Sequence, residues 1–135
     1  MAFNEVMTAA EVAALSPLNL AFVGDAVWSL LVRTRLVSEA NRSTHALNKA
    51  SSDRVCAVKQ SADYYQLLPH LSEVEVAVMK RGRNANPTSK AKNATVAEYR
   101  NATGLECLIG YLYLNGENAR LVEIFNICWS ENDEK

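Results

Sequence analysis

The sequence has little of what loop-rich, fibrous or disulfide-stabilised proteins need. Its 135 residues include only 3 prolines and 5 glycines, which argues against a loop-rich or fibrous protein. The 3 cysteines, Cys56, Cys107 and Cys128, are an odd number without Cys-x-x-Cys spacing. Such cysteines indicate reduced, buried thiols in a cytosolic protein. A zinc site is not expected either, because His45 and His70 are the only histidines and lie far apart.

An excess of charge of one sign and long apolar runs are missing as well. The 14 Lys and Arg residues against 15 Asp and Glu residues give a net charge of −1, so any nucleic-acid signal must be local. No uninterrupted apolar segment is long enough to cross a bilayer, and the N-terminus lacks the pattern of a signal peptide. We therefore expect a cytoplasmic protein without membrane contact. The hydrophobic content of 49% suffices for one core in a single domain, residues 1–135.

Helix-capping patterns recur along the chain and predict an all-α fold. In a capping box, Ser or Thr precedes Glu by three residues, and the chain has this pattern at Thr8–Glu11, Ser72–Glu75 and Thr95–Glu98. Ser16-Pro17 predicts the start of a long apolar helix that runs to about Val37. Asn115-Gly116 predicts the end of the helix that Thr95 opens. A last amphipathic helix is expected after it, with residues 130–135 as a frayed tail.

The middle of the chain is harder to assign. A third helix is expected from Ser43 or Thr44 to a break near residues 64–69. The alternating valines at 74, 76 and 78 are compatible with a strand, but the capping box and the basic residues that follow favour a helix ending at Gly82. Residues 83–94 are rich in Asn, Pro, Ser and Lys, which predicts a surface loop.

Two acidic residues stand alone in apolar runs. Asp25 lies in the apolar helix that begins at Pro17, and Glu106 lies in the run 104–112. If these helices are buried, each unpaired carboxylate costs several kcal/mol. Each acid could be satisfied locally, by Ser29, by Thr103 or by backbone groups. Alternatively, two facing helices could bring both carboxylates to one magnesium ion.

A cluster of basic side chains without an intervening acid follows the Ser72–Glu75 capping box. It consists of Lys80, Arg81, Arg83, Lys90 and Lys92, with Asn84 and Asn86 between them. The ordinary interpretation is a helix C-terminus followed by a solvated loop. The functional interpretation is a surface that binds RNA phosphates without reading sequence, with the two asparagines adding hydrogen bonds to phosphate or 2′-hydroxyl groups.

Two segments resemble the ribonuclease III catalytic domain. Residues 22–27, Phe-Val-Gly-Asp-Ala-Val, resemble its signature, and residues 105–114, Leu-Glu-Cys-Leu-Ile-Gly-Tyr-Leu-Tyr-Leu, resemble its second acidic motif. The segments 80–85 and 99–100 make the sequence most similar to the Mini-ribonuclease III subfamily, which has the catalytic domain without a double-stranded-RNA-binding domain. The resemblance covers about residues 18–114, in the expected order.

The resemblance implies an endonuclease that cleaves double-stranded RNA and leaves 5′-phosphate ends. It implies that Asp25 and Glu106 are catalytic metal ligands for Mg²⁺, with Mn²⁺ as a substitute. The implied substrate is the precursor of 23S ribosomal RNA, with ribosomal proteins as candidate partners. It also implies a homodimer that packs through the signature helix, with Phe22 at the interface.

The sequence also departs from full-length ribonuclease III at two ligand positions. Ala21 stands where a glutamate is usual, and Thr103 stands where an aspartate is usual. The Mini subfamily shares this reduced set. Arg100, about a turn and a half before Glu106, is not expected to act in the active site. The rival hypothesis is a catalytically weak or inactive helical RNA-binding or ribosome-associated module with the same fold.

Overall fold

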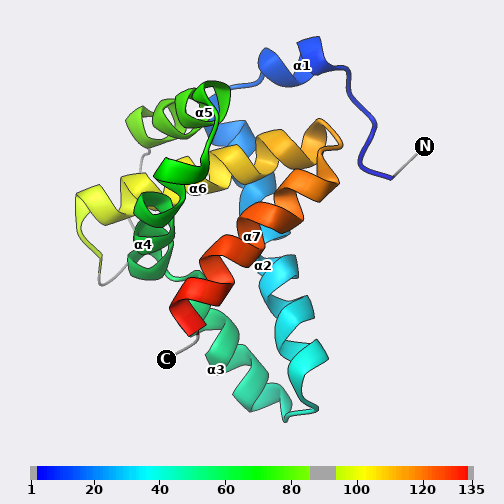
Figure 1. Cartoon of the computed structure of the whole chain (residues 1–135), viewed down its shortest axis with the longest axis vertical. Helices are drawn as coiled ribbons and strands as arrows, with labels where there is room; N and C mark the ends of the chain where they lie inside the picture. Colours follow the sequence, from blue (N-terminus) through cyan, green and yellow to red (C-terminus); the bar gives the residue numbers. More distant parts are fainter. Residues whose placement is uncertain (1–2, 86–93, 134–135) are drawn as a thin grey trace.

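A computed structural model describes residues 3–85 and 94–133, with side chains up to residue 129, and all regular structure in these ranges is helical (Figure 1). The helices are α1 (Ala9–Ala13), α2 (Pro17–Glu39), α3 (Thr44–Val55), α4 (Ala57–Leu67), the short 3-10 helix η1 (Leu68–His70), α5 (Glu73–Asn84), α6 (Val96–Leu114) and α7 (Asn118–Asp133). The all-α prediction is confirmed, and the valines at 74, 76 and 78 lie in a helix.

All three predicted capping boxes are present. In each, the N-cap hydroxyl accepts a hydrogen bond from the N3 backbone and the N3 glutamate accepts one from the N-cap backbone. Ser16 caps α2, whose first residue is Pro17, as the sequence predicts. Gly116 adopts a φ of 70° just after α6, a conformation that glycine favours. Local sequence chemistry therefore fixes where most helices begin.

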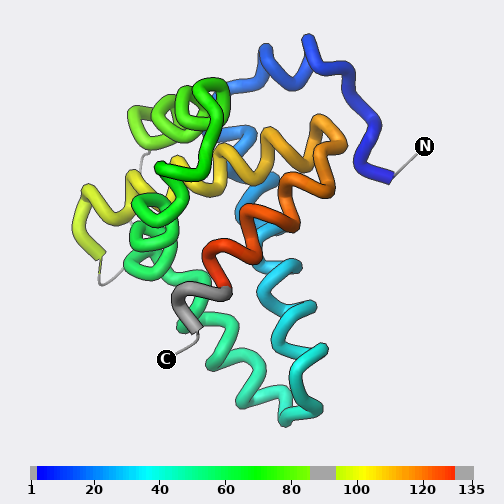
Figure 2. Tube along the Cα trace, viewed as in Figure 1, coloured from blue at the N-terminus to red at the C-terminus, as the bar shows by residue number. Residues whose placement is uncertain are grey.

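Helix α6 lies at the centre of the molecule, and α2 passes directly beneath it (Figures 1 and 2). A Cβ atom on Gly24 would lie 1.7 Å from the carbonyl oxygen of Glu106, and one on Gly110 would lie 1.9 Å from that of Leu20. The two helix backbones are therefore in direct contact, which only glycine permits at these positions. This contact fixes the relative position of the two helices that carry Asp25 and Glu106.

A second close contact joins α5 to α6. A Cβ on Gly82 would lie 2.5 Å from the Cβ of Cys107, and one on Gly104 would lie 2.7 Å from the carbonyl oxygen of Met79. Our prediction that Gly82 ends its helix is wrong, since α5 continues to Asn84. Gly82 is buried inside the helix because it packs against α6, and packing here outweighs the low helix propensity of glycine.

Three further expectations are corrected. The third helix is two helices, because Cys56, with φ −66° and ψ 158°, is extended and separates α3 from α4. The thiol of Cys56 is exposed, whereas Cys107 and Cys128 are buried, and all three are free. The chain between residues 130 and 133 is helical rather than frayed, since α7 continues to Asp133.

The core surrounds α6 and includes one buried ion pair. Trp28 of α2 is fully buried and makes an edge-to-face contact with Phe125 of α7, with ring centroids 5.3 Å apart. The Arg54 guanidinium donates to the Asp63 carboxylate at 2.8 Å, and Asp63 is completely buried. Because each charge compensates the other, this pair links α3 to α4 across the break at Cys56.

One face of α2 is not covered. Leu18, Phe22, Leu30 and Val37 are exposed on this helix, with Phe22 83% exposed. The expectation that this apolar helix is mostly buried is therefore wrong for this face, which we call the open face of α2. The helix is apolar on more sides than α3, α5 and α6 can cover. Within the described part of the chain, no helix is both long and apolar enough to span a membrane.

Candidate active site

The structure brings Asp25 and Glu106 together. Gly24 contacts the backbone of Glu106, so the next residue, Asp25, lies beside the Glu106 side chain. The two carboxyl groups are close enough for a hydrogen bond between them. The expectation that Asp25 is buried is wrong: it is exposed, because it lies toward the uncovered side of α2, while Glu106 is half-buried. The pair therefore has one protein-facing and one solvent-facing member.

The environment of Glu106 favours its protonated form. The pKa of this carboxyl is raised to about 8, first by burial, then by the negative charge of Asp25 and the hydrogen bond between the two groups. Near neutral pH the pair therefore shares a proton. A divalent cation would stabilise both carboxylates in place of that proton, so the donor set fits such an ion.

A third side chain at this site was not assigned from the sequence. Gln60 of α4 is buried, with an exposed fraction of 2%, and its amide lies near Glu106 and lowers the pKa of that carboxyl, while its Nε2 has no hydrogen-bond partner among the described residues. An amide N–H directed at a carboxylate has this effect because it stabilises the charged form. In the sequence, Gln60 is one of the residues that fit the Mini-ribonuclease III pattern, but that resemblance gives it no role at the site.

The two positions that differ from full-length ribonuclease III supply no ligands here. Ala21 is buried, and the hydroxyl of Thr103 donates to the carbonyl oxygen of Tyr99 at 3.0 Å. Thr103 therefore satisfies a backbone group of its own helix rather than Glu106. No group of three or more His, Cys, Asp or Glu residues that could hold a metal occurs among the described residues. A cation at Asp25 and Glu106 would thus complete its shell with waters or substrate oxygens, as Mg²⁺ commonly does.

Part of the basic segment lies on α5, near the carboxylates. Lys80, Arg81 and Asn84 are exposed and Arg83 is half-buried in the last turns of this helix, so Arg83 and Asn84 are not in a loop as expected. Burial raises the pKa of the Cys107 thiol to about 11, and the positive charge of Arg81 partly offsets this increase. Arg81 is therefore close to the residue that follows Glu106. The candidates Asn86, Lys90 and Lys92 lie outside the described residues.

We predict that Glu106 makes the stability of the metal-free protein depend on pH. Folding raises the pKa of this acid from 4.5 to about 8, so the folded state keeps a proton that the unfolded state releases. Stability should therefore fall as the pH rises between about 5 and about 9, and Glu106→Gln should remove this contribution. Thermal unfolding with a chelator present, at several pH values, measures the effect.

An exposed acid provides the control for this experiment. Glu73→Gln, at the start of α5, should leave the pH dependence as in the wild type. Glu75, whose pKa is lowered first by its hydrogen bond with Arg120, contributes stability that is lost only as the pH falls below the range tested. Parallel curves for the wild type and Glu106→Gln would contradict the prediction.

Comparisons with known proteins find similar proteins over most of the chain. Residues 18–117 match the family model of the Ribonuclease III domain. The Mini-ribonuclease 3 of Brevibacillus brevis is 47% identical over 109 residues, 81% of this chain and 81% of that protein. The Mini-ribonuclease 3 of Thermoanaerobacter sp. is 42% identical over 124 residues, 92% of this chain and 87% of that protein. A crystal structure of a Fusobacterium nucleatum protein is similar with a TM-score of 0.81 and 32% identity, covering 90% of this chain and 98% of that one.

Proposed function

Because the chain belongs to the ribonuclease III family, it is an endoribonuclease that acts on double-stranded RNA, and we propose that Asp25 and Glu106 form its cleavage site. The observation that carries this proposal is the pairing of these two carboxyl groups, since Glu106 keeps a proton at neutral pH first because it is buried and then because it lies beside the charge of Asp25. Two acids on different helices that share a proton are suited to a divalent metal ion.

We assign each residue of the site a separate task. Asp25 and Glu106 would hold Mg²⁺, or Mn²⁺ in its place, and the bound metal supplies an activated water and offsets charge on the phosphate. The Gln60 amide, whose Nε2 is buried without a hydrogen-bond partner among the described residues, lies near Glu106 and favours the ionised form that would bind the metal. The exposed side of Asp25 leaves room for waters and for the RNA strand. Hydrolysis leaves the phosphate on the 5′ end of one product.

The experiment that tests the proposal uses purified protein and labelled duplex RNA. We expect cleavage in the presence of Mg²⁺, none with a chelator, and products that carry 5′-phosphate ends. Binding should weaken steeply as salt is added, because the contacts are to phosphates. Binding without cleavage at any divalent-metal concentration would favour the rival hypothesis of an inactive RNA-binding module.

We propose that the basic end of α5 and the segment that follows hold the RNA backbone. Lys80, Arg81 and Arg83 form no ion pair with an acid in the described part of the chain, so their charges are available for phosphates. Asn84 could add a hydrogen bond, and we extend the same role to Asn86, Lys90 and Lys92. The proposed substrate is the precursor of 23S ribosomal RNA, in the cytoplasm, with ribosomal proteins as candidate partners.

We propose that the open face of α2 is covered by a second copy of the chain. Its four exposed apolar side chains, Leu18, Phe22, Leu30 and Val37, lie on one helix, and exposed apolar side chains gathered on one element are typical of an interface. Phe22 is the most exposed of them and lies one turn before Asp25. A symmetric contact through this face would therefore bring two cleavage sites near each other, as needed to cut both strands.

We predict that Phe22→Glu makes the protein monomeric. A carboxylate in the centre of an apolar interface would lose its hydration without gaining a partner, and this loss destabilises the dimer by more than the apolar contact stabilises it. Sedimentation velocity measures the change. Val74→Glu is the matched control, since Val74 is also exposed, at 58%, but lies on α5. A wild type that is monomeric, or a dimer that survives Phe22→Glu, would contradict the proposed interface.

A further inference from the structure

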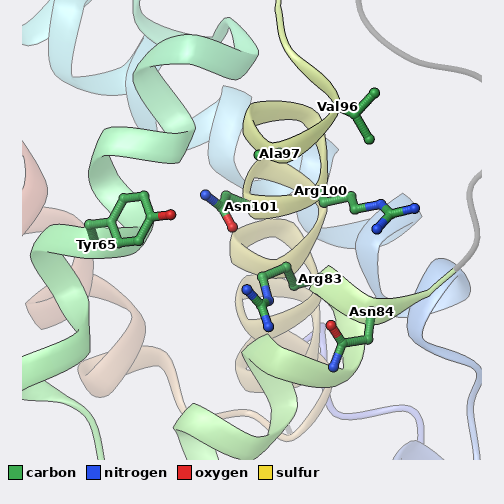
Figure 3. A pocket seen from close by; sticks show the side chains of 7 residues that line it. All are labelled: Tyr65, Arg83, Asn84, Val96, Ala97, Arg100 and Asn101. Carbon is green, nitrogen blue, oxygen red and sulfur yellow. The ribbon is translucent and has the colours of Figure 1, made fainter.

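A cavity of about 310 Å³ lies between α4, the end of α5 and the start of α6. It is lined by Tyr65, Arg83, Asn84, Val96, Ala97, Arg100 and Asn101. Figure 3 shows Asn101 between Tyr65 and Arg83, while Arg100 extends from the other side of α6. We call this cavity the α6 pocket. Only Arg83 and Asn84 of its lining belong to the RNA-binding residues proposed above.

The α6 pocket is positively charged. Its lining includes two guanidinium groups, those of Arg83 and Arg100, and no carboxylate. Neither arginine forms a salt bridge with an acid in the ranges that the structure describes. The Nε of Arg83 is buried and has no hydrogen-bond partner among the described residues. A buried N–H donor without an acceptor destabilises the folded protein unless a bound ligand accepts its hydrogen bond.

The first turn of α6 adds to this charge. Val96 and Ala97, the first two residues of a 19-residue helix, line the pocket. The capping box satisfies the backbone N–H groups of Thr95 and Glu98 but leaves those of Val96 and Ala97 without a partner in the helix. The helix dipole places about half a positive charge at this end, which favours anions.

Two polar side chains give the pocket a fixed floor and one wall. Asn101 is 3% exposed, and its amide nitrogen donates to the Ser61 hydroxyl at 3.0 Å, so α4 holds it in place. Tyr65 is largely exposed, and its ring stands edge-on to Tyr64 with centroids 5.5 Å apart. The pocket thus combines two arginines with hydrogen-bonding side chains, of which Asn101 is held in place by α4.

We propose that the α6 pocket binds a phosphate monoester. Two arginines and the first turn of α6 bring positive charge to the pocket, which suits a dianion better than the single charge of a phosphodiester. The volume is at the lower end of that of small-molecule sites and admits a phosphate with its ribose. Two kinds of ligand carry such a phosphate monoester: the 5′-phosphate end of an RNA strand, which is the first source, and a free nucleoside monophosphate, which is the second. The first source rests on the proposed function; the second does not.

The first test is an NMR titration of the metal-free protein with inorganic phosphate, against sodium chloride at equal ionic strength. We expect shifts in the amides of Val96, Ala97 and Asn101 with phosphate alone. Arg100→Ala should weaken phosphate binding by roughly tenfold, since a charge-assisted pair is lost. Arg33→Ala, which removes an exposed arginine of α2 outside the pocket, is the matched control.

The second test separates the two sources. Binding of a duplex with 5′-phosphate ends is compared with that of the same duplex with 5′-hydroxyl ends, and adenosine 5′-monophosphate is used as a competitor. Tighter binding of the phosphorylated duplex, lost in Arg100→Ala, assigns the pocket to an RNA end. Equal binding of the duplexes together with binding of the mononucleotide assigns it to a free ester. An absence of phosphate-specific shifts overturns the proposal, whatever the cleavage assay gives.

Discussion

Asp25→Asn and Glu106→Gln are each expected to lower the rate of duplex cleavage by roughly a thousandfold or more, because each removes one of the two carboxylates that we propose as protein ligands of the metal. The positions that could supply further carboxylates hold Ala21 and Thr103, and Thr103 is already bonded to Tyr99. Either variant should still bind duplex RNA, since the basic residues of α5 are unchanged. Cleavage under single-turnover conditions and binding in parallel measure the two effects.

Asp53→Asn is a suitable control for this result. Asp53 is an exposed acid of α3 that pairs with Lys49 at 3.3 Å, and its loss should leave the cleavage rate unchanged. Cleavage by Glu106→Gln at more than a tenth of the wild-type rate would show that this carboxylate is not a metal ligand. A variant that fails to bind RNA would instead point to a structural role, which thermal unfolding would reveal.

Gly24→Ala is expected to lower the free energy of unfolding by at least about 3 kcal/mol, and the chain is expected to lose its fold near physiological temperature. The added Cβ would lie 1.7 Å from the carbonyl oxygen of Glu106, which belongs to the backbone and cannot rotate away. The α2 and α6 helices would have to separate, which opens the core around Trp28. Chemical denaturation measures the loss.

Thr34→Ala, at an exposed position of the same helix, should change stability by less than about 0.5 kcal/mol and serves as the control. Gly82→Ala should be milder than Gly24→Ala, because its closest contact, the Cβ of Cys107, would lie 2.5 Å away and the nearest backbone atom, the Cα of Gly104, 3.0 Å away, rather than 1.7 Å. A Gly24→Ala variant with wild-type stability would mean that the two helices can shift apart at little cost.

The sequence predicted features that depend on neighbouring residues. Capping boxes, the proline that opens α2 and the glycine after α6 act within a few residues, so they can be recognised without the fold. The break at Cys56 has no such marker: it contains neither proline nor glycine, and the buried pair of Arg54 and Asp63 forms across it. The end of α5 was misplaced because Gly82 is a packing residue, and packing is a property of two helices.

The candidate site was predicted in part. The two lone acids could be found because each interrupts an apolar run, and the family resemblance joined them. The sequence could not predict that Asp25 is exposed and Glu106 half-buried, since the open face of α2 depends on which sides the other helices cover. Gln60 also became visible only in the fold, because its partner Glu106 is distant in the chain.

The contact between Gly24 and the Glu106 backbone has a consequence for how the enzyme responds to damage. The atoms that hold α2 against α6 are next to the atoms that hold the catalytic pair, so the site has no separate support that could loosen first. Heat or core mutations should leave each folded molecule fully competent and reduce only the number of folded molecules. The remaining activity of a heated or mutated sample should therefore equal the fraction of chains that are still folded, rather than reflect a gradual decline in each chain.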